Sequence, residues 1–328
     1  NMNFSSLRYA LRGLSAYRTL LDDENESILD YATTVLYTLA NGQKEQDEEE
    51  RAEWGENALS AYACLFQALC DGGFSGIGDW LWDKLRYTET PFALSAQSDG
   101  ASPALEQAAR RDVDALLALA GLDCGAILTA IAALLPPEQT SMVEAMPRWV
   151  SSAPFDFDRL VQFYRDHGAG LYARYRAFLW EDGQLIPVAD PDCPQPQDLL
   201  GYELQREQVE QNTRLLLSGR QANNVLLFGD GGTGKSATVK SMLYLPGMED
   251  LRLIEIQKEN LTGLPSLIRS LASRRQKFIL FIDDLAFDKE DRTFSSLKTI
   301  LEGGLEPRPV NVAVYCTSNR RHLVRQNF

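Results

Sequence analysis

Residues 229–236 read GDGGTGKS, a run of glycines that ends in a lysine and a serine. The run matches the spacing G-x-x-x-x-G-K-[ST], in which glycines allow backbone N–H groups to curl around phosphate oxygens. In such a loop Lys235 would reach the β- and γ-phosphates of a nucleotide, and the Ser236 hydroxyl would ligate Mg²⁺. Three interpretations compete at this point: an ATP-hydrolysing enzyme, a nucleotide-gated switch, or a flexible turn without function.

A second group suited to a phosphate site follows in FILFIDDL (278–285). Its apolar run predicts a parallel strand, and the acids stand where such a strand ends at the ligand-binding edge of a sheet. Asp283 is the expected Mg²⁺ partner, and Asp284 is placed to orient or polarise the attacking water. The alternative is an aspartate pair that only caps the strand. The last apolar run is followed by Asn319, which could hold the water or the γ-phosphate, or belong to a turn.

The elements that would position these groups are short apolar runs that alternate with amphipathic helical segments. Runs that are apolar on both faces are typical of parallel strands covered by helices on each side. The predicted strands are NVLLF (224–228), LRLIEI (251–256), KFILFI (277–282) and VNVAVYC (310–316). The predicted helices lie near 235–244, 264–276 and 293–305. This order predicts a doubly wound α/β domain with a parallel sheet.

Together, GDGGTGKS, ILFIDDL and TSNRRHL, preceded by LLGYELQREQ (199–208), resemble the AAA+ P-loop ATPases. Within them the set is most similar to an uncharacterised bacterial family of ATP-binding proteins, whose motifs have the style of helicase loaders. The resemblance covers about residues 197–328. It implies an ATPase that binds ATP or ADP with Mg²⁺ and couples hydrolysis to the remodelling of a partner.

The resemblance also implies a role for each matching residue. The catalytic groups would be Lys235, Asp284 and Asn319, the last as sensor 1. The metal would be held by Ser236 and Asp283. The nucleotide would lie against Gly229, Asp230, Gly231, Gly232, Thr233, Gly234, Lys235, Ser236 and Ala237, with Gly201 and Tyr202 at the adenine pocket.

Three features depart from the family's pattern. The second acid of the Walker B motif is Asp284, where many AAA+ enzymes have Glu, and its shorter reach could slow hydrolysis. The segment QKENLTGLP (257–265) has no aromatic–hydrophobic–glycine loop, which disfavours a substrate-threading unfoldase. The sequence ends at Phe328, before an arginine finger, a fifth strand and a helical lid. Loose nucleotide binding, very slow hydrolysis and weak or no ring assembly are therefore expected of residues 1–328.

AAA+ sheets are usually ordered 5-1-4-3-2, which would place the strand at 224–228 at the edge of the sheet. An apolar, unpaired edge strand is a liability that folded proteins cover or pair. We expect the N-terminal domain, the hairpin at 177–188 or a neighbouring molecule to shield it.

The first part of the chain predicts a mostly helical domain, residues 1–176, because apolar residues recur at three- and four-residue spacing. AFLW-EDGQ-LIPV predicts a β-hairpin around Asp182-Gly183, and the proline-rich ADPDCPQPQD that follows predicts a linker. Hairpin and linker together span 177–198. The ATPase core then covers 199–328.

Charge is spread unevenly over these parts. The whole chain has a net charge of −14, and residues 1–196 contain 14 Lys and Arg against 30 Asp and Glu, a net of −16. Such a segment repels a phosphate backbone, which disfavours a nucleic-acid partner. Arg320, Arg321 and Arg325 nevertheless leave a DNA-acting loader as an alternative. We expect the acidic domain to recruit a protein partner, and the resemblance implies a homo-oligomer for the full-length protein.

Cysteine content and hydropathy bear on the compartment. Five cysteines without a C-x-x-C pair indicate neither a disulfide framework nor a zinc site, and they fit a reducing cytoplasm. The most apolar stretch, Val113–Leu135, is interrupted by charges and predicts two core helices rather than a membrane span. The basic N-terminal segment could be a targeting peptide, but its leucine spacing fits a first amphipathic helix and it lacks an apolar core.

Overall fold

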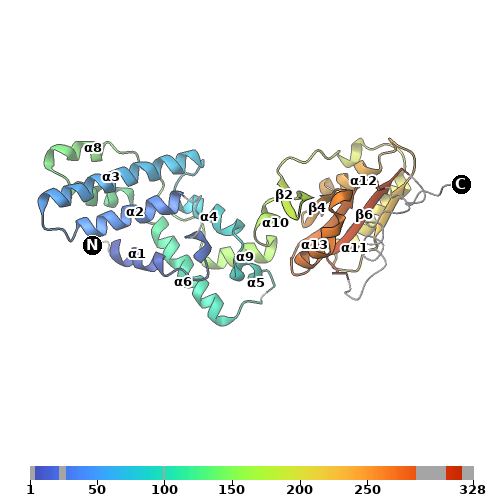
Figure 1. The fold of residues 1–328 in the computed structure, drawn as a ribbon, viewed down its shortest axis with the longest axis horizontal. Helices are drawn as coiled ribbons and strands as arrows, with labels where there is room; N and C mark the ends of the chain where they lie inside the picture. The colour runs from blue at the N-terminus through green and yellow to red at the C-terminus, as the bar shows by residue number, and fades with distance from the viewer. Residues whose placement is uncertain (1–3, 22–26, 99, 286–307, 320–328) are drawn as a thin grey trace. The chain divides into compact units, whose positions relative to one another are not determined.

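The computed structural model describes residues 4–21, 27–98, 100–285 and 308–319. The chain divides into two compact units: Asn1–Asp166, here called the helical unit, and His167–Phe328, here called the sheet unit (Figure 1). The hairpin that the sequence placed between the domains is part of the sheet of the second unit. The proline-rich segment 189–198 therefore runs within the sheet unit and does not join the two units.

The described part of the helical unit is built from α-helices and two 3₁₀ turns, in agreement with the mostly helical domain that the periodicity predicts. The α-helices are α1 (Phe4–Arg12), α2 (Ser27–Gly42), α3 (Glu48–Asp71), α4 (Ile77–Tyr87), α5 (Pro91–Ala96), α6 (Pro103–Ala120), α7 (Cys124–Ala132), α8 (Thr140–Glu144) and α9 (Phe157–His167). The 3₁₀ turns are η1 (Arg18–Leu20) and η2 (Pro137–Gln139).

Several of these helices begin at residues whose side chains cap them. Asp47 accepts hydrogen bonds from two backbone N–H groups in the first turn of α3, and Ser102 accepts one at the start of α6. Such caps satisfy N–H groups that have no partner within the helix. Asp47 and the glutamates that follow it therefore form the N-terminus of α3, with three glutamates in its first turn.

One buried carboxylate ties the first loop to α6. Asp112 is 1% exposed, and its Oδ2 accepts the backbone N–H groups of Ser15, Ala16 and Tyr17 at 2.7, 2.7 and 3.2 Å. Arg111 lies 3.1 Å from its other oxygen. These bonds satisfy a charge that would otherwise be costly to bury.

Within the described residues, no single helix is long and apolar enough to cross a membrane. The helices α6 and α7 pass the length and composition test only as a pair, and they are bent by 67° relative to each other. These two helices correspond to the apolar stretch that the sequence divides into two core helices.

The sheet unit has a mixed sheet with helices on both sides. Its strands are β1 (Ala177–Glu181), β2 (Gln184–Val188), β3 (Val225–Phe228), β4 (Leu251–Ile256), β5 (Lys277–Ile282) and β6 (Val312–Ser318). Its helices are α10 (Leu171–Arg174), η3 (Pro196–Asp198), α11 (Glu203–Leu217), α12 (Lys235–Ser241), η4 (Met242–Tyr244), η5 (Lys258–Gly263) and α13 (Leu264–Leu271). The helix expected near 293–305 lies outside the described residues, as do Arg320, Arg321 and Arg325.

The described strands follow the order β2-β1-β4-β5-β6-β3. All neighbours are parallel except the antiparallel pair of β1 and β2. The order β3-β6-β5-β4 is the 1-4-3-2 arrangement that the resemblance implies, with the strand before the glycine-rich loop at one edge. The α/β class with a mostly parallel sheet is therefore confirmed.

Alternating side chains of the strands enter two separate cores. On one face, residues such as Ile254, Leu280 and Val314 pack against α13 and α10. On the other face, Leu253, Phe281 and their neighbours pack against α11 and α12. Burial on both faces explains why the strands have no polar alternation in the sequence.

The hairpin extends the sheet at the edge opposite β3. Residues of β1 pair in parallel with β4, with Ala177 opposite Leu253, and β2 forms the outer strand. The expectation that the hairpin shields β3 is therefore wrong. Leu226 and Phe228 of β3 are 39% and 53% exposed. Shielding of β3 by the N-terminal domain or by a neighbouring molecule stays a prediction.

Candidate functional site

The glycine-rich loop connects the end of β3 to the start of α12. Gly232 and Gly234 have φ angles of 77° and 80°, in the left-handed region that side chains with a Cβ disfavour. No atom lies within 4 Å of a Cβ built on either residue, so conformation, not space, requires glycine here. The Thr233 hydroxyl donates to the Asp230 carbonyl across the loop at 2.9 Å. The loop is thus wound into a compact turn.

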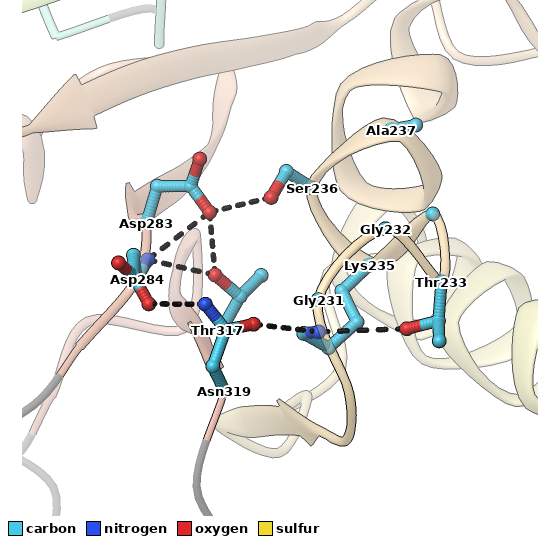
Figure 2. A pocket seen from close by; sticks show the side chains of 11 residues that line it. Gly231, Gly232, Thr233, Lys235, Ser236, Ala237, Asp283, Asp284, Thr317 and Asn319 are labelled. Atoms are coloured by element: carbon cyan, nitrogen blue, oxygen red, sulfur yellow. Dashed lines mark hydrogen bonds between the residues drawn. The ribbon is translucent and has the colours of Figure 1, made fainter.

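Lys235 and Ser236 are the first two residues of α12. The Lys235 ammonium donates to the carbonyl oxygens of Gly229 and Asp230 at 3.0 and 2.7 Å, so it lies over the loop. Its Nζ also lies 3.0 Å from Oδ1 of Asn319. The positive charge is therefore held between the loop and the end of β6 (Figure 2).

The ends of β5 and β6 bring the acids next to this loop. The strands are parallel, with Ile282 opposite Cys316, so the residues that follow, Asp283 and Thr317, are neighbours. Oδ1 of Asp283 accepts the Ser236 hydroxyl at 2.5 Å. The two motifs that the sequence separates by 47 residues are thus in direct contact.

Asp284 has a left-handed backbone, with φ of 48°, and its side chain turns toward Asn319. The Asn319 amide donates to Oδ1 of Asp284 at 2.9 Å, while the amide oxygen accepts from Lys235. Asn319 therefore joins the second acid to the lysine. The three predicted catalytic residues, Lys235, Asp284 and Asn319, are therefore linked in one network of hydrogen bonds.

The oxygen atoms of Asp283 and Ser236 are suitable ligands for a magnesium ion. Mg²⁺ binds carboxylate and hydroxyl oxygens and is held in nucleotide sites by one or two protein groups together with phosphates. The hydroxyl of Ser236 and the carboxylate of Asp283 are such a pair, and their contact shows that both can reach a common point. When held by Ser236 and Asp283, the ion would neutralise part of the negative charge of bound phosphates.

Two cavities adjoin the loop. The first has a volume of about 290 Å³ and is lined by loop residues together with Asp283, Asp284, Thr317 and Asn319. The second, of about 760 Å³, lies between α11 and β3 and shares Thr233 and Lys235 with the first.

Tyr202, one of the two residues expected at an adenine pocket, lines the second cavity. Gly201 precedes it in the chain but does not line either cavity. Both residues have positive φ angles, 74° for Gly201 and 56° for Tyr202, so the chain turns sharply before α11 begins. The structure therefore brings Tyr202 to the same hollow as the loop, with Gly201 as part of the turn that places it.

A lysine one turn further along α12 forms an ion pair beside Ser236 and Asp283. Nζ of Lys240 lies 2.9 Å from Glu255 of β4. Burial by itself would lower the pKa of Lys240, but the hydrogen bond and charge of Glu255, with the charge of Asp283, raise it above its ordinary value. Lys240 therefore stays charged and paired near the site at neutral pH.

Sequence reasoning missed Thr317, which is 1% exposed. Its hydroxyl donates to Oδ1 of Asp283 at 2.5 Å and accepts the N–H of Asp284 at 2.9 Å. The available signal was a hydroxyl residue two positions before Asn319, directly after the strand expected at 310–316. At the neighbouring Cys316, burial raises the pKa of the thiol to about 12, which favours the protonated form at neutral pH.

Comparison with protein families gives a match over the sheet unit. The model of a family described as a protein of unknown function (DUF815) matches residues 173–328. Among solved structures, a mutant of RuvB from Thermotoga maritima is similar, with 16% sequence identity and a TM-score of 0.31. That match covers 41% of this chain and 44% of the RuvB chain, so less than half of the RuvB chain is spanned. A comparison with proteins of curated function gives no match.

Strand order, the wound glycine loop and the adjacent strand-end acid together define the sheet unit as an α/β P-loop NTPase fold. The family match begins at residue 173, within the sheet unit, and does not extend over the helical unit.

Proposed function

We propose that the sheet unit is an AAA+-type ATPase module that binds ATP or ADP with Mg²⁺. The observation that carries the proposal is the direct contact of Ser236 with Asp283, beside Lys235 on the same loop. Lys235 would contact the β- and γ-phosphates and Ser236 and Asp283 the metal. Tyr202 would border the base in the larger cavity.

Hydrolysis would use Asp284 and Asn319. Asp284 would orient the attacking water, and Asn319 would hold that water or the γ-phosphate, since its amide lies between the acid and the lysine. A positioned acid or base of this kind contributes about 10²–10⁴-fold to a rate. The chain of hydrogen bonds explains how one amide could register the presence of the γ-phosphate.

A nucleotide-gated switch with negligible turnover is the second candidate. The hydrogen bond between Asn319 and Asp284 favours the switch, because Oδ1 of Asp284 already accepts the Asn319 amide at 2.9 Å. An aspartate held in this way reaches less far toward a water than a glutamate would. Phosphate release from bound ATP in a single turnover separates the two functions, since the switch binds ATP and does not cleave it.

We propose that the helical unit recruits a protein partner for remodelling. It contains 12 Lys and Arg against 26 Asp and Glu, whereas the sheet unit contains 20 of each. An acidic surface disfavours nucleic acid and favours a basic protein surface. Capture of a defined basic protein by the whole chain, lost at high salt, is the expected behaviour.

The test of nucleotide binding is Lys235→Ala, measured by titration calorimetry with ADP and Mg²⁺. Loss of a hydrogen bond to a charged group is worth about 1.5–3 kcal/mol, so the affinity should fall about 10–150-fold. The fold should remain, because the Lys235 ammonium contacts loop carbonyls and no core residue.

The matched control is Lys277→Ala, at the start of β5 and so at the opposite end of the strand that leads to Asp283. Its affinity should equal that of the wild type. Equal affinity of wild type and Lys235→Ala would refute the proposed site.

A further inference from the structure

We infer that Thr317 is a positioning residue for both acids of the site, an assignment that rests on the proposed nucleotide site. Its side-chain hydroxyl is the donor to the Asp283 carboxylate and the acceptor from the Asp284 backbone. One hydroxyl therefore sets the direction of the metal-binding carboxylate and the backbone of the residue that would orient water (Figure 2).

The strand geometry explains why this position can act on both acids. β5 and β6 are in parallel register up to Ile282 and Cys316, and Thr317 follows directly opposite Asp283. The backbone continues the link, because the Thr317 carbonyl accepts the Leu285 N–H at 2.7 Å. The side chain and main chain of one residue thus hold both ends of the turn that contains Asp283 and Asp284.

The turn needs such support because its backbone is strained. A left-handed backbone conformation is uncommon for residues other than glycine, and it persists where contacts with the surrounding structure hold the backbone in place. The Asp284 N–H is held by Oδ1 of Asp283 at 3.1 Å and by Oγ1 of Thr317 at 2.9 Å. Removal of the Thr317 hydroxyl takes away the shorter of these two bonds to the Asp284 N–H. It also takes away a buried hydrogen-bond donor to the Asp283 carboxylate.

The hydrogen bond from Thr317 should affect how well Asp283 binds Mg²⁺. Oδ1 of Asp283 receives Ser236 and Thr317 from two directions, which fixes the carboxylate between the loop and β6. A carboxylate that is free to rotate would hold Mg²⁺ less well, because a bound Mg²⁺ demands near-ideal geometry. Thr317 is 1% exposed and its hydroxyl is bonded to the two acids, so its loss should change metal-free nucleotide binding little.

The experiment compares Thr317→Val, which keeps the shape and removes the hydroxyl, with Thr317→Ser, which keeps the hydroxyl. ADP affinity is measured by calorimetry in Mg²⁺ and in EDTA. We expect Thr317→Val to weaken binding about tenfold or more in Mg²⁺, as for the loss of a hydrogen bond to a charged group, and less than about twofold in EDTA. Thr317→Ser should restore the Mg²⁺-dependent part.

Thr213→Val is the matched control: it is a fully buried threonine of the same unit, whose hydroxyl contacts Tyr315 and the Val209 carbonyl rather than the acids. It should retain the wild-type response to Mg²⁺, and thermal unfolding of each variant checks the fold. A wild-type response in Thr317→Val, or an equal loss in Thr213→Val or Thr317→Ser, overturns the inference alone. A wild type that binds no nucleotide overturns the proposed function and this inference with it.

Discussion

The two adjacent acids offer a direct test of the division of labour at the site. We expect Asp283→Asn to weaken Mg²⁺-nucleotide binding and Asp284→Asn to leave binding nearly unchanged while lowering turnover. Asparagine is the right replacement at both positions, since it keeps an oxygen that can accept hydrogen bonds. At Asp284 it also tolerates the left-handed backbone, with φ of 48°, where alanine would add about 1 kcal/mol of strain.

The magnitude follows from the contacts. Oδ1 of Asp283 receives the hydroxyls of Ser236 and Thr317 and the N–H of Asp284, all of which an asparagine oxygen can still accept. What is lost is the negative charge opposite the metal. A contact to a charged group is worth about 1.5–3 kcal/mol, which corresponds to about 10–150-fold in affinity for Mg²⁺-ADP.

The second acid should give the opposite pattern. The side chain of Asp284 contacts Asn319 rather than Ser236, the proposed metal ligand. A group that orients water acts mainly in the transition state, so turnover should fall about 10²–10⁴-fold while affinity changes less than about threefold. Calorimetry measures the affinity, and phosphate release with protein in excess over ATP measures a slow turnover.

Asp182→Asn is a matched control, because Asp182 is an exposed aspartate of the sheet unit with the same backbone conformation, φ 49°, in the hairpin turn. It removes one negative charge without touching the site and should change neither affinity nor rate. Equal losses of affinity in Asp283→Asn and Asp284→Asn would show that Asp284 is a metal ligand and refute the division of roles.

Two further predictions concern the stability of the helical unit. Asp112→Ala leaves three backbone N–H groups, two of them buried, without their acceptor and should lower the free energy of unfolding by about 3 kcal/mol in urea titrations, whereas the exposed Asp114→Ala on the same helix should change it little. Burial raises the pKa of Tyr17 and of Tyr164 above that of a tyrosine in the unfolded chain, so the neutral form is favoured in the fold. Stability should therefore be complete below about pH 10 and fall as the pH rises above it. Tyr17→Phe with Tyr164→Phe should reduce that loss, Tyr9→Phe should not, and an unchanged loss in the double variant would show that other groups cause it.

Local patterns predicted much of the sheet unit. The strand at 251–256 and the strand at 277–282 have the predicted bounds, because continuous apolar runs between turns are a strong signal for buried strands. The turn at Asp182-Gly183 was also predictable, since both residues adopt positive φ angles that this pair favours. β6 begins two residues later than predicted, at Val312, where a turn to the Pro309 carbonyl delays the strand.

The partner of the hairpin was not predictable in the same way. Its own sequence determines that β1 and β2 pair, through the turn and its strand-forming residues. That β1 also pairs with β4 depends on contacts between residues more than seventy positions apart, such as Ala177 and Leu253. A proline-rich segment after the hairpin indicated a boundary between domains, but prolines also terminate an edge strand and start a connection within one domain. The local signal was correct and its assignment to a linker was not.

The candidate site shows the same division between local pattern and long-range pairing. The loop residues, Asp283, Asp284 and Asn319 were predicted as candidates because their residue types and their positions after a strand suit phosphate chemistry, and the structure brings them together. Thr317 was not, because a threonine inside a strand is most often an ordinary β-former. Its proposed role depends on the register of β5 and β6, which brings its hydroxyl within hydrogen-bond distance of the Asp283 carboxylate and the Asp284 N–H. Residues that bind a ligand can be recognised from the motif they belong to, whereas a residue that aligns them is recognised only when the neighbouring strand is in place.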